Sequence, residues 1–388
     1  MTPAMQKIYL DYHATTPVDR RVADRVCQYM IAEFGNASST DHEYGDRAEA
    51  AIKQAANHVA TLINATLREI IWTSGATESI NLAIQGSLTL NPAKPHRIAL
   101  LPIEHKAVLD TCQALEKRGC AELVYLKIDS QGRLDLNQLE QVCQDSLSLL
   151  CVMAANNEIG NIYPIQAIGQ ITQRYNIPFL CDASQAVGKI PLNFEAWGIT
   201  YLAISAHKLY GPKGVGALAV RRGYRLEPLM FGGGHQKGMR SGTLNVPGIV
   251  GLGEACRLRQ LEMVEDEQAI AHKRNRLQQL LSAQFPYLVV NGDTDDRLAG
   301  NLHISIPGIP NSAVIARIRH ILAISTGSAC SSGVESPSHV LQAIKLSEDL
   351  IEGALRIGIG KFTTDDEIIQ AAKILTEAIC QVSRKMAS

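Results

Sequence analysis

Residues 201–214, YLAISAHKLYGPKG, indicate both a fold and the kind of site that it carries. The apolar run 201–205 is typical of a buried strand, and Lys208 follows it almost directly. Gly211 and Gly214 let the backbone turn sharply and approach a ligand closely. Because an open α/β sheet binds its ligands beyond the carboxyl ends of its strands, this stretch predicts a lysine at the ligand-binding edge of such a sheet.

A second strand-end group, Asp182, follows the apolar run 177–181. A partly desolvated lysine can lose its proton and act as an amine nucleophile, although a lysine before a turn is more commonly a solvated surface residue. A carboxylate at the same edge can keep a pyridinium nitrogen protonated. Asp182 and Lys208 together therefore predict a pyridoxal 5′-phosphate site, with Lys208 carrying the Schiff base.

Composition limits the classes of protein that the chain can belong to. Its 388 residues favour two domains, and 46% hydrophobic with 19% charged residues is typical of a globular protein. A formal net charge of −1 argues against a nucleic-acid binder. The apolar run 147–155 is too short to span a membrane, and the first ten residues lack a signal-peptide pattern. We expect a cytoplasmic protein that binds neither nucleic acid nor membrane.

The order of predicted elements indicates an α/β fold. Between about residues 50 and 220, short apolar strands alternate with helical patterns, which favours a mostly parallel sheet covered by helices. The expected strands are 69–73, 97–102, 123–128, 148–154, 178–182, 201–205 and 215–220, with helices at 104–118, 136–144 and 165–175. A charged helical stretch, 253–284, then leads to strands 301–306, 322–325 and 354–359 and a closing helix, 365–385. We expect a large central α/β domain and a smaller C-terminal α+β domain.

Other strand ends carry polar groups of the kind that a cofactor site needs. The segment 73–79, TSGATES, opens a helix after a strand, so its free N–H groups and Thr77 predict an anion cradle, although an ordinary helix cap fits the same pattern. Ser205 and His207 are placed to complete that cradle. His105 could stack on a planar ring and move protons, and the amide at 156–157 could orient a ligand, although a turn explains the latter equally well.

The nine cysteines divide into two groups. No two are spaced as Cys-x-x-Cys, which argues against a metal site. Eight lie within apolar patterns and are expected to be small buried hydrophobes: Cys27, Cys112, Cys120, Cys143, Cys151, Cys181, Cys256 and Cys380. The ninth, Cys330, lies in STGSACSSG, residues 325–333, where no residue is larger than threonine or cysteine. Such a segment predicts a mobile loop carrying a nucleophilic thiol, or else a cysteine that merely tolerates exposure.

Several longer segments resemble one family. They are 9–17 (YLDYHATTP), 34–36 (FGN), 73–78 (TSGATE), 104–109 (EHKAVL), 156–160 (NNEIG) and 238–243 (GMRSGT). Their sequence and order are similar to those of cysteine desulfurases of the NifS/IscS type, in class V of the pyridoxal phosphate aminotransferase superfamily. The resemblance extends from about residue 8 to 380, and the segment around Cys330 is similar to the group I version.

The resemblance implies a role for each matching residue. Lys208 would bind pyridoxal phosphate covalently, Asp182 its pyridine nitrogen, Gln185 its phenolic oxygen, and His105 would stack on its ring. The phosphate would be bound by Ala76, Thr77, Ser205 and His207, with Thr243 reaching across from a partner subunit. Asn157 would bind both the cofactor and the substrate, Arg356 and Asn36 would bind substrate, and Cys330 would take the sulfur. No metal is implied.

The resemblance also implies an architecture and partners. A fold-type I enzyme would have a large cofactor-binding domain at 16–260 and a small domain at 1–15 plus 261–388, and would form a homodimer. Its substrate would be L-cysteine, and its sulfur acceptor a protein such as an iron–sulfur scaffold. The sequence departs from the family pattern at Ala37, where proline is usual, and it ends at Ser388 without the tail by which IscS members dock a scaffold, so the acceptor stays open.

The expected reaction converts L-cysteine to L-alanine and a persulfide on Cys330. Two alternatives remain. A β-lyase, selenocysteine lyase or aminotransferase on the same scaffold would not need Cys330. A non-catalytic subunit of the same fold would not need Lys208, Asp182 and His105 together.

Overall fold

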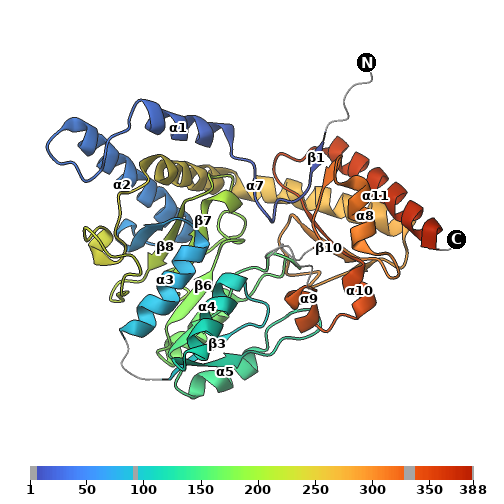
Figure 1. Cartoon of the computed structure of the whole chain (residues 1–388), viewed down its shortest axis with the longest axis horizontal. Coiled ribbons are helices and arrows are strands. Elements are labelled where there is room, and N and C mark those ends of the chain that lie inside the picture. Colours follow the sequence, from blue (N-terminus) through green and yellow to red (C-terminus); the bar gives the residue numbers. More distant parts are fainter. Residues whose placement is uncertain (1–6, 91–94, 327–336, 387–388) are drawn as a thin grey trace.

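The chain folds into two lobes joined by one long helix, α7 (Val246–Gln284), which runs from one lobe into the other (Figure 1). The computed structural model describes residues 7–90, 95–326 and 337–386. Cys330 lies outside these residues. The predicted combination of a large, mostly parallel sheet domain with a smaller α+β lobe is confirmed. In the described part of the chain, no helix combines the length and apolar character needed to cross a membrane.

The large lobe is built on a seven-stranded sheet. Its strands, in spatial order, are β2 (Ile70–Thr73), β8 (Gly216–Val220), β7 (Tyr201–Ser205), β6 (Phe179–Asp182), β5 (Leu149–Cys151), β3 (His96–Leu100) and β4 (Ala121–Tyr125). Only β8 runs antiparallel to its neighbours. The chain order reverses between β3 and β5, and such a reversal leaves a crevice at the carboxyl ends of the strands.

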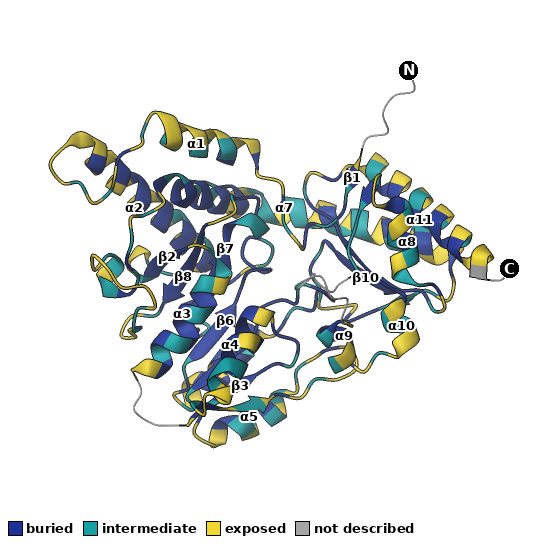
Figure 2. Cartoon of the chain, in the orientation of Figure 1, coloured by how far each residue is buried: buried dark blue, intermediate teal, exposed yellow. Residues whose placement is uncertain are grey.

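Helices cover both faces of this sheet, so its central strands are apolar on both sides, as the sequence predicts (Figure 2). One face packs against α3 (Ala76–Thr89) and α4 (Lys106–Lys117). The other packs against α2 (Glu43–Ile63), α5 (Leu136–Gln144), α6 (Ile165–Arg174) and the first part of α7. Outside them, α1 (Arg20–Ile31) lies on the surface with Val22 as its one buried residue, so the expectation that Cys27 is buried is wrong. Cys120 and Cys380, also expected to be buried, are only partly so.

The small lobe has its own core. An antiparallel sheet of β12 (Ala354–Gly358), β10 (Asn301–Ser305) and β9 (Val289–Val290) packs against α8 (Asn311–Ile318), α11 (Asp365–Met386) and the end of α7. The N-terminal strand β1 (Ile8–Tyr9) joins this lobe by pairing with β11 (Leu322–Ala323). Two short helices follow. α9 (His339–Ala343) packs its Val340 and Leu341 into the core of the large lobe, and α10 (Glu348–Glu352) contacts β10 of the small lobe. The domain boundaries near residues 15 and 260 stay a prediction, although Ile8, Leu10 and Ile270 do pack in the second core.

Helix ends differ from the predicted ranges where a cap decides them. The helix expected from 104 begins at Lys106, because the His105 side chain accepts a hydrogen bond from Ala107 N and caps it. The helix expected from 253 begins at Val246, since Asn245 caps it and proline occupies its first turn. The helix predicted at 136–144 is confirmed residue for residue, with Asp135 as its cap.

Candidate active site

A pocket of about 580 Å³ lies at the carboxyl ends of the parallel strands, between the two lobes. Ten of the residues predicted for the site line it: Lys208, Asp182, His105, Asn157, Gln185, Ala76, Thr77, Ser205, His207 and Arg356. Nine come from the large lobe, and Arg356 comes from β12 of the small lobe. The structure therefore gathers groups that are far apart in sequence around one cavity.

Lys208 ends the short helix η2 (Ala206–Lys208), directly after β7. Its Nζ donates hydrogen bonds to the carbonyl oxygens of His13, at 2.5 Å, and Ala14, at 2.8 Å. Burial, followed by the charges of the neighbouring cations Lys189 and Arg356, lowers the pKa of this amine to about 7. Near neutral pH, Lys208 is therefore uncharged in a substantial fraction of the molecules, and the uncharged amine is the nucleophilic form.

Asp182 ends β6 with its carboxylate in the pocket wall. Its Oδ1 accepts hydrogen bonds from the backbone N–H of Ser184, at 3.0 Å, and from the Ser184 hydroxyl, at 2.5 Å. Among the described residues, Oδ2 accepts none. The Ser184 bonds fix the orientation of the carboxylate and leave Oδ2 available to a protonated ring nitrogen.

The predicted anion cradle lies at the start of α3. Gly75 caps this helix with φ 154° and ψ 179°, a conformation essentially restricted to glycine. Of the atoms of the described residues, a Cβ at Gly75 would meet only the Ser205 hydroxyl, at 4.0 Å, so those residues leave room beside the glycine. The first N–H groups of the helix have no partner within it, and Thr77 and Ser205 add hydroxyl groups beside them.

Glu78 holds the cradle in place. One of its carboxylate oxygens accepts a hydrogen bond from Ser74 N at 2.7 Å, and the other pairs with Arg240 at 2.8 Å. His207 completes the wall with Nδ1 beside the Thr15 hydroxyl at 3.1 Å. Burial lowers the pKa of His207 to about 4, with Lys208 nearby as the next cause, so this imidazole is neutral at pH 7.

His105 has a defined tautomer when its ring is neutral. Its Nδ1 accepts the backbone N–H of Ala107 at 3.1 Å, so the proton of the neutral ring is on Nε2. The preceding carboxyl group, Glu104, is fully buried and accepts Met153 N at 2.8 Å. Burial raises the pKa of Glu104, which lies beneath the site, well above its ordinary value and so favours its protonated form.

Arg356 is the main cationic group that the small lobe contributes. It is 3% exposed, and its NH2 group donates to Asp11 at 3.0 Å while NH1 donates to the Asn157 carbonyl oxygen at 3.2 Å. Among the residues that the structure describes, its buried Nε has no hydrogen-bond partner. A largely buried guanidinium that lines a pocket is suited to binding a carboxylate.

Among the described residues, two of those predicted for the site, Asn36 and Thr243, do not line this pocket. Asn36 is exposed, and its side chain accepts the N–H of Ser38 at 3.0 Å within a local turn. Thr243 is exposed, in the segment that follows Arg240. Cys330 cannot be placed, since it lies outside the described residues. The assigned roles of all three stay predictions.

The sequence did not predict the residues that orient the functional groups through hydrogen bonds. The backbone carbonyls of His13 and Ala14 bind Lys208, and Ser184 orients Asp182. No sequence pattern marks a backbone carbonyl as a ligand of a distant lysine. The segment 9–17 could have been found only because it resembles a family motif.

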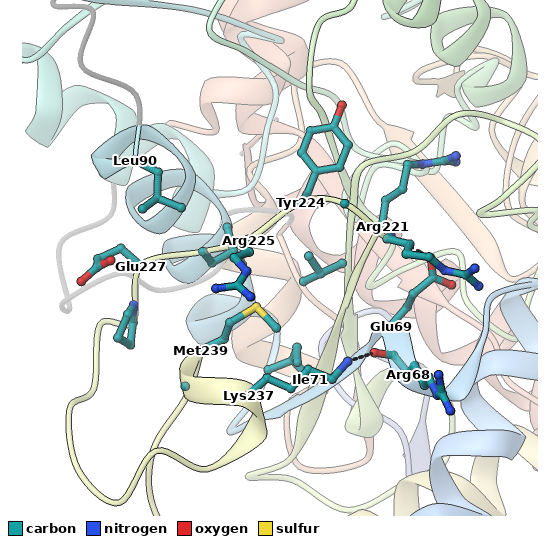
Figure 3. Close-up of a pocket in the computed structure, with 16 residues that line it drawn as sticks. Arg68, Glu69, Ile71, Leu90, Arg221, Tyr224, Arg225, Glu227, Lys237 and Met239 are labelled. Carbon is teal, nitrogen blue, oxygen red and sulfur yellow. Dashed lines mark hydrogen bonds between the residues drawn. The ribbon is translucent and has the colours of Figure 1, made fainter.

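A second pocket, of about 550 Å³, opens beside the edge strand β2 and shares no lining residue with the first (Figure 3). Basic side chains surround it, and Lys237 Nζ donates to the Arg68 carbonyl oxygen at 2.5 Å. Next to it, the Gln236 amide pairs with both the N–H and the C=O of Trp72, at 2.6 and 2.9 Å. Together these bonds fasten the start of the segment that leads to Thr243 onto the free edge of the sheet.

Comparison with known proteins gives one consistent result. Residues 8–370 match the Aminotransferase class-V family. The chain is 44% identical over 374 residues to "Cysteine desulfurase IscS" of Anaeromyxobacter sp. (strain Fw109-5), which covers 96% of this chain and 92% of that protein. It is 45% identical over 376 residues to the protein of the same name from Colwellia psychrerythraea (strain 34H / ATCC BAA-681), with the same coverage. Among solved structures, a NifS-like protein superposes with a TM-score of 0.89 at 33% identity, covering 96% of this chain and 99% of that one.

Proposed function

The chain belongs to the Aminotransferase class-V family, among the cysteine desulfurases, and from this premise we propose that it converts L-cysteine to L-alanine and a persulfide on Cys330. The reaction balances as L-cysteine plus the enzyme thiol giving L-alanine plus the enzyme persulfide. The observation that carries the proposal is the arrangement of Lys208, Asp182 and Arg356 around one pocket. It supplies a nucleophilic amine, an acceptor for a ring N–H and a carboxylate-binding group.

The residues of the pocket fit pyridoxal phosphate, the cofactor of this family. Lys208 has the lowered pKa that bond formation with an aldehyde requires. Asp182 has one carboxylate oxygen, Oδ2, that accepts no hydrogen bond from the described residues. Gly75 leaves room for a phosphate beside the free N–H groups of α3. Ala76, Thr77, Ser205 and His207 would complete the phosphate site, and Gln185 would bind the phenolic oxygen. When bound, this cofactor acts as an electron sink that stabilises negative charge at the substrate Cα.

Side chains of this protein bind the substrate, transfer its protons and accept its sulfur. Arg356 and Asn157 hold the substrate carboxylate, which places Cα near Lys208. The uncharged Lys208 amine takes the Cα proton, because its pKa is close to neutral pH. His105 carries a proton on Nε2 and exchanges it with the substrate thiol. The Cys330 thiolate forms a bond to the substrate sulfur while the carbon–sulfur bond breaks, and the carbon keeps the electron pair and is protonated to the methyl group of alanine.

The described flanks of the segment that carries Cys330 support its assignment. On one side, Ser325 exchanges backbone hydrogen bonds with Arg356 at 2.7 and 3.1 Å. On the other side, the Ser338 hydroxyl donates to Glu158 at 2.5 Å, one residue from Asn157. Both flanks are thus attached to residues next to the proposed carboxylate site.

The products and the cofactor band test this proposal. Protein supplied with pyridoxal phosphate should show a visible absorption band that Lys208→Ala lacks, and cysteine with a reducing thiol should give alanine and sulfide in equal amounts. Pyruvate and ammonia in place of alanine would identify a β-lyase. A wild-type protein that stays colourless would remove the cofactor assignment. Turnover of selenocysteine under the same conditions shows which chalcogen is preferred.

We further propose a two-fold homodimer and a protein sulfur acceptor, such as an iron–sulfur scaffold, in the cytoplasm. Two observations support the dimer: the segment containing Thr243 is pinned to its own lobe by the Arg240–Glu78 pair, and next to it Met230 and Phe231 are 46% and 79% exposed. Large exposed apolar side chains on a fixed segment are typical of a protein interface. An acceptor protein would receive the sulfur from Cys330.

A further inference from the structure

Lys189 lies behind the wall of the active-site pocket, where the prediction gave it no role. It follows Gln185 by one turn and does not line the pocket itself. Its Nζ donates a hydrogen bond to Gln185 Oε1 at 3.0 Å. Gln185 is 4% exposed and does line the pocket, so the lysine contacts the site through this amide.

This contact fixes which end of the Gln185 amide faces the cofactor. An ammonium group only donates hydrogen bonds, so the atom next to Lys189 Nζ has to be the amide oxygen. The ring Nδ1 of His13 lies 3.4 Å from the same oxygen and adds a second partner. The amide nitrogen of Gln185 therefore points the other way. One of its N–H groups donates to the His13 carbonyl oxygen at 2.9 Å, and among the described residues the other has no partner.

The helix α7, which connects the two lobes, holds the turn that carries Lys189. Arg259, which is 1% exposed, donates to the Gly188 carbonyl oxygen at 2.6 Å, to Glu267 at 2.8 Å and to Asp266. Gly188 has φ 72°, and a Cβ there would come within 2.9 Å of the Arg259 side chain. The turn therefore packs against α7 with no space for a side chain at position 188, and this contact fixes the position of the Lys189 backbone.

Glu267 keeps Lys189 charged in this setting. Burial lowers the pKa of Lys189 to about 8, and the negative charge of Glu267 opposes that shift. Lys189 is therefore still mostly an ammonium at pH 7. As the next cause after burial, its charge lowers the pKa of both Lys208 and His13.

We propose that Lys189 is a positioning residue of this site: its ammonium holds the Gln185 amide with Nε2 toward the pocket, so that the amide donates a hydrogen bond to the ring oxygen of bound pyridoxal phosphate. The inference rests on the proposed function, because the cofactor and its ring oxygen are taken from there. Without Lys189 the amide can rotate and present Oε1, which would repel that oxygen.

The sign of the expected effect follows from charge. Deprotonation of the bound cofactor adds negative charge at its ring oxygen, so an N–H donor and a nearby ammonium both favour the deprotonated form. Loss of Lys189 therefore raises the apparent pKa of the cofactor. Several titratable and charged groups face this part of the site. They are Asp11 and His13 from the N-terminal segment, His105 at the start of α4, Asp182 from β6, His207 and Lys208 from η2, Lys213 from the loop after η2, Arg259, Asp266 and Glu267 from α7, and Arg356 from β12.

The test is a pH titration of the cofactor absorption in wild-type, Lys189→Met and Lys189→Arg holoenzyme without substrate. Lys189→Met should raise the apparent pKa by about one pH unit, a tenfold shift in the protonation equilibrium. Lys189→Arg keeps a charged donor and should restore most of the wild-type value. If Lys189→Met does not give folded holoenzyme, Lys189→Gln removes the charge with a side chain of similar polarity and should shift the pKa in the same direction.

A double-variant cycle with Gln185→Leu separates positioning from charge alone. If Lys189 acts through the amide, Lys189→Met should shift the pKa much less in the Gln185→Leu background than in the wild type. Equal shifts in both backgrounds, or a Lys189→Met pKa within a few tenths of wild type, would overturn the positioning role. These outcomes are distinct from failure of the proposed function, in which the wild-type protein shows no cofactor band to titrate.

Discussion

Replacing Arg356 by lysine should weaken the use of L-cysteine without abolishing the cofactor site. Arg356 donates hydrogen bonds from NH2 to Asp11 and from NH1 to the Asn157 carbonyl oxygen. A lysine cannot keep both bonds and also bind a carboxylate. A hydrogen bond to a charged group contributes about 1.5–3 kcal/mol, and each 1.4 kcal/mol is tenfold. We therefore expect kcat/KM for L-cysteine to fall roughly 10- to 100-fold, mainly through a higher KM, because the carboxylate is bound before and during the reaction.

Steady-state alanine production measures this effect, and cysteamine provides the internal comparison. Cysteamine lacks the carboxylate, so its spectroscopically measured affinity for the holoenzyme should be similar in Arg356→Lys and in wild type. Arg319→Lys, on the exposed end of α8, is the matched control and should leave kcat/KM unchanged. A fall of less than threefold for L-cysteine, or an equal loss of affinity for cysteamine, would refute carboxylate binding by Arg356.

Three further outcomes follow from the structure. In the cofactor-free protein, acylation of Lys208 should reach half of its maximal rate near pH 7, whereas exposed lysines should need a pH above 10; half-maximal labelling above pH 9 would contradict burial as the cause. Phe231→Asp should convert a dimer into a monomer of 42.2 kDa in sedimentation, and an unchanged dimer would exclude this residue from the interface. Burial raises the pKa of Glu158 from 4.5 to about 7, so its contribution to stability is complete below pH 4.5 and is lost as pH rises through 7. Glu158→Gln should remove up to about 3 kcal/mol of that pH dependence, and denaturation curves of equal pH dependence in both proteins would count against it.

The strand ends could be predicted from sequence because parallel strands meet at one edge of a sheet. His105, Asn157, Asp182 and Lys208 each follow an apolar run, and all four line one pocket. Lys208 and Asp182 were interpretable as a pair for the same reason, since β6 and β7 are neighbours in the sheet.

The supporting contacts could not be predicted in the same way, because they join distant segments through the backbone or through buried charges. The bond from Lys208 to the His13 carbonyl oxygen depends on how the N-terminal strand joins the small lobe. Lys189 follows an ordinary apolar turn in the sequence, and only its contact with Gln185 identifies it.

The central claim is that Cys330 receives the sulfur of L-cysteine, and comparison of Cys330→Ala with the wild type tests it most directly. After one round of cysteine without reductant, mass spectrometry of the wild-type protein should show one added sulfur atom on the peptide containing Cys330. Cys330→Ala should keep the cofactor absorption band and its change on adding cysteine, because the residues that line the pocket are intact. Its production of alanine should fall by several orders of magnitude. Near-normal alanine production by Cys330→Ala, or an added sulfur atom on another cysteine of the wild-type protein, would contradict this account.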